Sequence, residues 1–460
     1  MRHRGCPSSS DHRWRDSCWN VAATERVLAE DAARGVVVDG TRIVELIGRG
    51  AEPASPIDAV FDASRHVVLP GLINTHHHFF QTLARAHPAG IDKELFPWLA
   101  SLYPIWGRLD REMFTLGVRL ALTELLMSGC TTAMYHHYLF APGIEDAIDI
   151  EVEEAKALGI RAVMTRGSLT LGVKDGGVTP DHCVEDEDTI LADSERLLGR
   201  YHDRSEGAMT QIALAPCAPF SVSLSLMQRA AELAERHDCR LHTHLGETTD
   251  EEVYCVERLG MRPVDWLDEA GWLTARTWLA HGIHFTTEEC RRLGRHGVGV
   301  CHCPTSNATL ASGFCKTLEL EAAGSPVGLG VDGSASNDSS NLMEEVRHAV
   351  LVNRLHYGSA SAVTHRDALR WASEGSARCL GRRDIGRIAA FMQADLALFT
   401  LDELRFSGAH DPIAALVLCG AHRADRVMVA GQWRIVDGVP PGVDLDALMA
   451  AHQTAAKRFA

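Results

Sequence analysis

Residues 211–247, QIALAPCAPFSVSLSLMQRAAELAERHDCRLHTHLGE, contain two apolar runs separated by an amphipathic segment. Ile212–Ala215 and Arg240–His244 have the pattern of strands, and Leu226–Arg236 between them has the apolar spacing of a helix. A strand, a helix and a second strand in this order join two parallel strands, because only a long crossover can return the chain to the same end of a sheet.

The same alternation continues from about residue 70 to about residue 382. The other clear strand-like runs, and one more helical run, are Arg161–Met164, Thr277–His281, Gly297–Cys301, Val327–Val331 and Thr287–Arg295. Repeated units of this kind predict an α/β fold, a (β/α)8 TIM barrel with its site at the C-terminal ends of the strands.

Both ends of the chain are rich in β-branched residues interrupted by Gly and Asp. The segments are Gly35–Asp39, Arg42–Ile47 and His66–Leu69 at one end, and Ala394–Thr400, Arg426–Ala430 and Trp433–Val436 at the other. We expect one small β-sandwich domain built from the N- and C-terminal segments. The expected boundaries are 1–69 plus 383–440 for the sandwich, 70–382 for the catalytic barrel and 441–460 for a C-terminal helix.

The composition is that of an ordinary globular protein, with 46% hydrophobic and 23% charged residues. The formal net charge is −16 and no basic run appears, which argues against a nucleic-acid partner and favours a small-molecule substrate. The N-terminus lacks the apolar core of a signal peptide, and no stretch approaches the ~18 apolar residues of a membrane span. We therefore expect a cytoplasmic protein with no membrane partner, and we expect a homo-oligomer.

The 13 cysteines show no disulfide-module spacing and are expected to be reduced and mostly buried. Cys301-His302-Cys303 resembles part of a metal site, but no second cysteine pair lies at the required spacing. Structural packing is the better interpretation of this triplet.

Pro70-Gly-Leu-Ile-Asn-Thr-His76-His-His78 ends a predicted strand with a histidine pair. His76 and His78 are two residues apart, so their imidazoles project to the same side and can reach one cation. His77 points the opposite way and is expected to pack.

A third imidazole comes from Arg240-Leu-His-Thr-His244-Leu-Gly-Glu247. His244 ends the predicted strand, and Glu247 follows at a position that suits a carboxylate beside a metal-bound water, whether or not it is also a ligand. His242 shares the face of His244 but lies one layer deeper, so we expect a buried strand histidine.

Two further strand ends carry polar residues. His281, in Trp278-Leu-Ala-His281-Gly-Ile-His284, is placed to polarise a substrate or to hold the nucleophile, whereas His284 is expected in the core. Asp332 precedes Gly333, which by itself indicates a turn. After three histidines directed at a metal, we instead expect Asp332 to be a ligand that also accepts a proton.

These motifs, in this order, resemble the mononuclear deaminases of the amidohydrolase superfamily, which include guanine, cytosine and adenosine types and the s-triazine hydrolases. The resemblance implies a TIM barrel, Glu247 as proton shuttle, His281 at the reacting centre, and one Zn²⁺ per chain on His76, His78, His244 and Asp332. The binuclear branch of the superfamily uses a carboxylated lysine on a middle strand. Residues 212–220 contain no lysine, so one metal ion is expected.

A narrower resemblance, from Val67 to Gly442, is to the bacterial deaminases of 8-oxoguanine. It is carried by Thr75–Leu83, Asp92–Trp98, Thr165–Ser168, Leu279–Phe285, Gly330–Asp338 and Arg405–Pro412. It implies attack of water at the purine C2, loss of the 2-amino group, and uric acid as product. The first 35 residues, Ala390-Phe391 and Tyr135 depart from the pattern, and Tyr135 lies near enough to the chemistry to affect specificity.

The substrate contacts expected from the sequence are Gln81, Cys217, Trp98 and Arg166. Trp98 and Tyr103 suit the wall of a planar ring, and the alternative is that both belong to the core, as aromatic residues at such spacing more often do. Gln81 suits the amide edge of a guanine-like ring, and an ordinary Gln at a helix start is an equal alternative. Arg166 suits a substrate carbonyl, and a bridge to an acidic residue is equally open.

The alternatives to 8-oxoguanine are isocytosine, guanine, isoxanthopterin or an s-triazine. Outside this class stand a catalytically inactive binding protein and a binuclear amide hydrolase.

Overall fold

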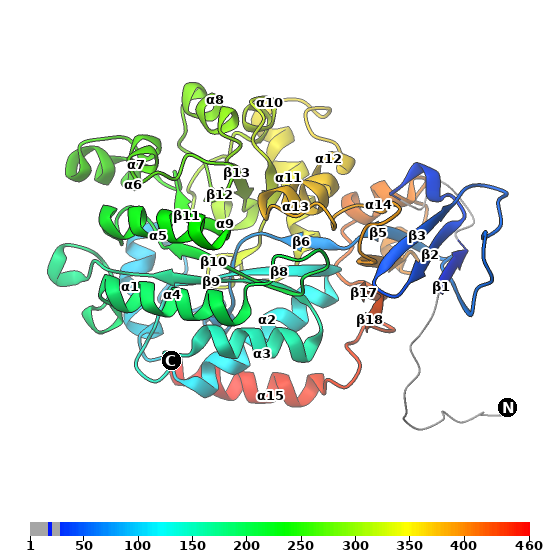
Figure 1. Cartoon of the computed structure of the whole chain (residues 1–460), viewed down its shortest axis with the longest axis horizontal. Coiled ribbons are helices and arrows are strands. Elements are labelled where there is room, and N and C mark those ends of the chain that lie inside the picture. The colour runs from blue at the N-terminus through cyan, green and yellow to red at the C-terminus, as the bar shows by residue number, and fades with distance from the viewer. Residues whose placement is uncertain (1–16, 21–27) are drawn as a thin grey trace.

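The computed structural model describes residues 17–20 and 28–460. Its centre is a parallel sheet in the order β14-β13-β12-β11-β10-β9-β8-β6 (Figure 1). The strands are β6 (Leu72–Asn74), β8 (Cys130–His137), β9 (Arg161–Ser168), β10 (Thr210–Pro216), β11 (Arg240–Leu245), β12 (Thr277–His281), β13 (Gly299–His302) and β14 (Val327–Leu329).

The first and last strands of this sheet are joined beyond their ends. The Thr75 N–H donates to the Leu329 carbonyl at 3.0 Å. The short strands β7 (His77–His78) and β15 (Asp332–Gly333) then pair in parallel. The sheet is therefore closed, and the TIM barrel predicted from the sequence is confirmed.

Helices cover the outside of the barrel. They are α1 (Leu95–Trp106), α2 (Arg111–Met127), α3 (Ala147–Leu158), α4 (Glu187–Tyr201), α5 (Leu224–His237), α6 (Thr249–Tyr254), α7 (Pro263–Glu269), α8 (Thr287–Arg295), α9 (Pro304–Thr309), α10 (Thr317–Ala322), α11 (Leu342–Tyr357), α12 (His365–Arg370) and α13 (Ser376–Cys379). Helix α5 shows why the predicted runs become helices: Ser223 caps it, and Leu226, Ala230 and Leu233 bury one face. No helix in the described part of the chain is long and apolar enough to span a membrane.

The two ends of the chain form two four-stranded sheets, in the orders β3-β2-β1-β4 and β18-β17-β16-β5, which lie to the right of the barrel in Figure 1. The strands are β1 (Ser17–Asn20), β2 (Gly35–Asp39), β3 (Arg42–Ile47), β4 (Ala59–Asp62), β5 (His66–Pro70), β16 (Leu396–Thr400), β17 (Arg426–Val429) and β18 (Gln432–Ile435). Val36 and Ile43 of one sheet share an apolar cluster with Val68, Leu396 and Met428 of the other. N- and C-terminal segments thus pack face to face, while the exact domain boundaries stay a prediction.

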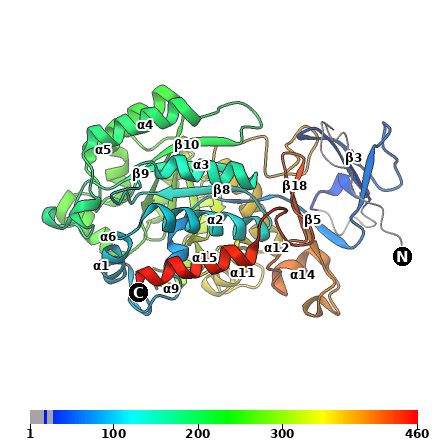
Figure 2. The ribbon, with the colours of Figure 1, turned by 90° about the horizontal axis from the view of Figure 1, so that it is seen from below.

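The C-terminal segment passes from this β region back to the barrel. Helix α14 (Pro412–Leu418) precedes β17, and α15 (Leu445–Ala456) lies beside α2 (Figure 2). His452 of α15 lies 3.1 Å from Thr82 Oγ1, in the short helix Phe79–Ala84 that follows the histidine pair. The last helix therefore supports the segment that carries His76 and His78.

The cysteines from Cys130 to Cys379 are buried and free, and Cys419 is exposed. Cys301 and Cys303 pack in an apolar cluster with Ile73, Met134 and Trp278. This agrees with structural packing for the Cys-His-Cys triplet.

Candidate metal centre

His76 is held by a chain of hydrogen bonds that fixes which nitrogen carries its proton. His242 Nδ1 lies 2.9 Å from the Trp278 carbonyl, and His242 Nε2 lies 2.9 Å from His76 Nδ1. Because a carbonyl only accepts, His242 Nδ1 must donate, and His242 Nε2 then accepts the proton of His76 Nδ1. The lone pair of His76 Nε2 faces the barrel centre, where this buried atom has no hydrogen-bond partner.

His78 and His244 are oriented in the same way. The Nδ1 atom of His78 donates to the His136 carbonyl, and that of His244 to the Cys217 carbonyl, each at 2.7 Å. Their Nε2 atoms lie 3.2 Å apart, so two lone pairs face each other without a proton between them. Such an arrangement is unfavourable by itself and becomes favourable when both nitrogens bind one cation.

Asp332 completes the donor set from the last strand. Its Oδ1 lies 3.2 Å from His76 Nε2 and 3.3 Å from His78 Nε2, while Oδ2 accepts from Ser306 Oγ at 2.6 Å. Burial alone would raise the pKa of Asp332, but its close contacts with His76 and His78 outweigh burial and hold the pKa well below its usual range. The carboxylate is therefore ionised.

Burial lowers the pKa of His76 and of His244 well below the usual value, so these two imidazoles are neutral. Three imidazoles and one carboxylate are a donor set that suits a divalent metal such as zinc. The residues present therefore fit a bound cation.

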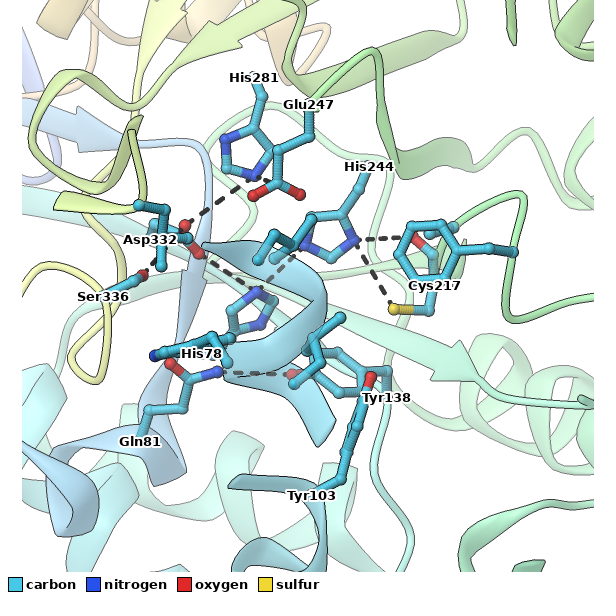
Figure 3. Close-up of a pocket in the computed structure, with 16 residues that line it drawn as sticks. His78, Gln81, Tyr103, Tyr138, Cys217, His244, Glu247, His281, Asp332 and Ser336 are labelled. Carbon is cyan, nitrogen blue, oxygen red and sulfur yellow. Dashed lines mark hydrogen bonds and ion pairs between the residues drawn. The ribbon is translucent and has the colours of Figure 1, made fainter. Parts of the chain in front are cut away.

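Glu247 and His281 lie on one side of this group (Figure 3). His281 Nδ1 lies 2.9 Å from Asn307 Oδ1, and His281 Nε2 lies 3.6 Å from Glu247 Oε2 and 3.9 Å from Asp332 Oδ2. Burial, and then the nearby Asp332, raise the pKa of Glu247 well above its usual value. A carboxyl in this position can hold a proton and release it to a neighbour.

The backbone is strained at two of these positions. His281 has φ +72° and Asp332 has φ +61°, a region that residues with a Cβ seldom adopt. Each costs on the order of 1 kcal/mol or more, so the surrounding structure must hold both residues in place. Both residues lie at the ends of strands from which their side chains enter the site.

A cavity opens beside the candidate metal ligands. Its lining residues are His78, Gln81, Leu95, Trp98, Leu99, Tyr103, Tyr138, Cys217, Ala218, Phe220, His244, Glu247, His281, Leu310, Asp332 and Ser336. The free volume is about 30 Å³, which is room for about one water molecule. The cavity is therefore narrow beside the candidate metal ligands.

Three of the predicted substrate contacts line this cavity: Gln81, Cys217 and Trp98. The Gln81 amide makes only long contacts, 3.4 Å each, to Tyr138 Oη and to the Ala335 N–H. Its polar atoms therefore remain largely available to a ligand.

Arg166 is not among the residues that line the cavity, and the predicted contact with substrate has to be corrected. Its Nη2 donates to Glu185 at 2.8 Å and its Nε to Asp193 at 2.7 Å, and its side chain is 1% exposed. The geometry matches the alternative given for Arg166 in the sequence analysis, which is an ion pair with acidic residues. The sequence did not reveal this because the fold of the connection from β9 to α4, which carries both partners, has no local signal.

Tyr135 also points away from the cavity. Its hydroxyl lies 2.9 Å from His137 Nδ1, and its ring stacks on Phe79 with centroids 4.2 Å apart. Strand residues alternate between faces, so His136 and Tyr138 face the interior while Tyr135 and His137 face the surrounding helices. Any effect of Tyr135 on specificity would pass through packing.

Sequence reasoning missed several residues of the site. His136 lies in a buried group with His76, His78 and His244, and Tyr138 lines the cavity. The i, i+2 spacing of His136 and Tyr138 was the signal that could have found both. Glu251, which accepts from the N–H groups of Gly246 and Glu247 at 2.7 and 3.0 Å, gave no comparable signal.

Comparison with known proteins agrees with this geometry. An 8-oxoguanine deaminase of Pseudomonas aeruginosa is 62% identical over 426 residues, which cover 93% of this chain and 95% of the relative. An isoxanthopterin deaminase from an unknown prokaryote is 35% identical, covering 90% of this chain and 92% of the relative.

Solved structures give the same result. The crystal structure of an atrazine chlorohydrolase from Arthrobacter aurescens, complexed with zinc, matches with a TM-score of 0.89 and 31% identity, covering 96% of this chain and 100% of that chain. The model of the amidohydrolase family matches residues 67–434. The chain therefore belongs to the amidohydrolase family.

Proposed function

We propose that this protein is a zinc-dependent aminohydrolase that converts 8-oxoguanine and water to uric acid and ammonia. The observation that carries the proposal is that His76 Nε2 and His78 Nε2 both lie beside the Asp332 carboxylate and that His244 Nε2 lies 3.2 Å from His78 Nε2. Glu247 and His281 lie next to this group. The 62% identity to a bacterial 8-oxoguanine deaminase supports the choice of substrate.

His76, His78, His244 and Asp332 would hold one zinc ion. When bound, such a cation supplies Lewis-acid activation of a water molecule at neutral pH. A single ion is favoured because no lysine lies on β10, Thr210–Pro216, to bridge a second one.

Glu247 is the group that would move protons. In the reaction a water oxygen bonds to C2, the bond from C2 to the 2-amino nitrogen breaks, and ammonia leaves. Glu247 takes one proton from the water and passes it to the ring nitrogen beside C2, which a carboxyl with a raised pKa can do. Asp332 accepts the second proton of the water, which is then transferred to the departing amine so that it leaves as ammonia. His281, held by Asn307, stabilises charge at the reacting carbon.

The ring would bind between the apolar wall and Gln81. Trp98, Tyr103 and Phe220 offer flat apolar surfaces around the cavity. The Gln81 amide supplies an acceptor and two donors for the –NH–C=O edge of the purine, and Cys217 contacts its far side. The cytoplasmic location and the homo-oligomeric state remain predictions from the sequence.

A second candidate is a hydrolase of isoxanthopterin or of an s-triazine on the same scaffold. Relatives and solved structures with those names are 35% and 31% identical to this chain. These proteins share the fold of this chain, so the fold does not distinguish between the candidate substrates. The preferred ring has to be identified by assay.

The test is a substrate panel on purified, zinc-loaded protein. Metal content is measured by elemental analysis. Ammonia release is followed with 8-oxoguanine, guanine, isocytosine and isoxanthopterin, and loss of the parent compound is followed with an s-triazine. We expect one zinc per chain and the highest kcat/KM with 8-oxoguanine. A higher kcat/KM with another ring would show that this ring, and not 8-oxoguanine, is the preferred substrate. Absence of hydrolysis of every ring would reject the proposed function.

A further inference from the structure

Glu247, the proposed proton carrier, stands on the short connection between strand β11 and helix α6. Its side chain lies beside His281, with Glu247 Oε2 3.6 Å from His281 Nε2 (Figure 3). A group that takes a proton at one atom and delivers it to another has to be held in place, since a displacement of about 1 Å can lower turnover by about 100-fold. The contacts that fix the backbone of Glu247 therefore bear on turnover.

Glu251 fixes this connection from the first turn of α6. Its Oε1 accepts from the Gly246 N–H at 2.7 Å, and its Oε2 accepts from the Glu247 N–H at 3.0 Å. One buried carboxylate thus bonds two consecutive backbone N–H groups. Burial raises the pKa of Glu251, although these two N–H groups act against it. Because each oxygen faces a donor, the ionised carboxylate is the form that matches the geometry.

Thr248 and Glu251 have the spacing of a capping box, which marks the start of a helix. In such a box the Thr248 hydroxyl accepts from the Glu251 N–H, and the glutamate accepts in return from the N–H of the capping residue. The first bond is present, at 3.3 Å. The glutamate, however, accepts from Gly246 and Glu247, which precede the capping residue, whereas the same spacing at α8 gives the ordinary box. The Glu251 side chain is therefore directed at the segment that carries Glu247.

The Gly246 carbonyl ties the same connection to the segment that follows His281. It accepts from the N–H groups of Ile283 and His284, each at 2.8 Å. Gly246 has φ +67°, a conformation that residues with a Cβ seldom adopt. Gly246 is thus held by Glu251 through its N–H and by the end of β12 through its carbonyl.

We infer that Glu251 is a positioning residue that holds Glu247 beside His281 for proton transfer. Glu251 is not among the residues that line the cavity, so it acts through Glu247 and not on the substrate. The inference rests on the proposed deaminase function, because it gives Glu251 a part in the same reaction.

Glu251→Gln tests the inference in the full-length, zinc-loaded protein. The amide oxygen can accept from one of the two backbone N–H groups, but the NH₂ group then faces the other, so a donor meets a donor. We expect kcat with the preferred substrate to fall by about 10- to 100-fold, because Glu247 is displaced. KM and zinc content are expected to stay near the parent values, since Glu251 contacts neither the substrate nor the proposed ligands.

A double-mutant cycle with Glu247→Gln separates positioning from a general loss of structure. If Glu251 acts through Glu247, Glu251→Gln lowers kcat much less in the Glu247→Gln background than in the parent. Hydrogen exchange of residues 246–248, followed by mass spectrometry, is a readout that does not depend on activity, and we expect faster exchange in Glu251→Gln. Glu251→Asp, which keeps both oxygens on a shorter side chain, repeats these measurements if Glu251→Gln fails to fold.

Glu252→Gln is the matched control. It removes the same charge from the next residue of α6, where the carboxylate pairs with Arg262 and is 34% exposed. This variant is expected to keep the kcat of the parent.

The outcomes separate the inference from the proposed function. With an active parent, the inference would be overturned by any of four results: parent-like kcat in the Glu251 variant, unchanged hydrogen exchange, an equal loss of kcat in both backgrounds, or the same loss in Glu252→Gln. A parent that hydrolyses none of the rings would instead reject the proposed function.

Discussion

His76 Nδ1 and His242 Nε2 lie 2.9 Å apart, and the Trp278 carbonyl at the far side of His242 sets the direction of the proton between them. One candidate metal ligand is thus oriented by a residue deeper in the barrel. Partners of this kind typically change metal affinity because they fix the ring and its tautomer.

His242→Phe tests this relationship. Phe keeps a ring against Trp278 but cannot accept from His76, so zinc affinity is expected to fall by about 10–100-fold. The measurement is zinc retention against a chelator of graded concentration. His242→Gln, which keeps an acceptor, is expected to recover part of the affinity, and His284→Phe serves as a control. Equal retention in the parent and His242→Phe would show that the hydrogen bond is dispensable.

Glu247→Gln separates proton transfer from metal binding. The amide keeps the shape of the side chain but cannot shuttle a proton, so kcat is expected to fall by about 10²–10⁴-fold. Zinc content by elemental analysis is expected to stay at the parent level, since Glu247 is not in the proposed ligand set. Near-parent turnover in a zinc-loaded variant would remove Glu247 from the mechanism.

Arg166→Met tests the corrected role of that arginine. The change leaves Glu185 and Asp193 without their buried cation, and the free energy of unfolding is expected to fall by about 3 kcal/mol. The KM for the preferred substrate is expected to remain unchanged in the folded protein. Arg200→Met removes a more exposed ion pair and is expected to cost less than about 1 kcal/mol. A raised KM together with an unchanged free energy of unfolding would indicate that Arg166 contacts the substrate.

Glu151 predicts a pH dependence of stability. It is fully buried on α3, its carboxyl oxygens lack hydrogen-bond partners among the described residues, and burial raises its pKa well above the usual value. Above about pH 4.5 the unfolded chain ionises this group while the folded chain keeps it protonated, so stability is lost as pH rises toward the folded pKa.

Glu151→Gln removes that titration. The stability of the variant relative to the parent is expected to increase by about 1.4 kcal/mol for each pH unit in this window. Urea unfolding of both proteins at about pH 5 and about pH 8 measures the change. Glu153→Gln, on the exposed side of the same helix, is the matched control. A difference between variant and parent that is the same at both pH values would mean that Glu151 ionises in the folded state.

Much of the fold could be predicted from the sequence because its strands and helices have local sequence patterns. The helix Thr287–Arg295 and the strand Thr277–His281 have in the structure the bounds that the sequence indicated. The histidine pair and the strand-end positions of His244 and Asp332 followed from the same periodicity. No local sequence pattern predicted how much free space the cavity has. None predicted that β7 and β15 pair to close the barrel.

The sequence by itself determined the alternation of strands and helices and the placement of ligand-type residues at strand ends. Periods of two and of about 3.6 residues are properties of the local backbone, which a chain displays wherever it folds. Only the tertiary structure decided that Arg166 meets acids instead of a substrate, that Tyr135 faces the helices, and that His242 holds His76. Those outcomes depend on which side chains meet once the strands and helices have packed, and a local sequence pattern does not show that.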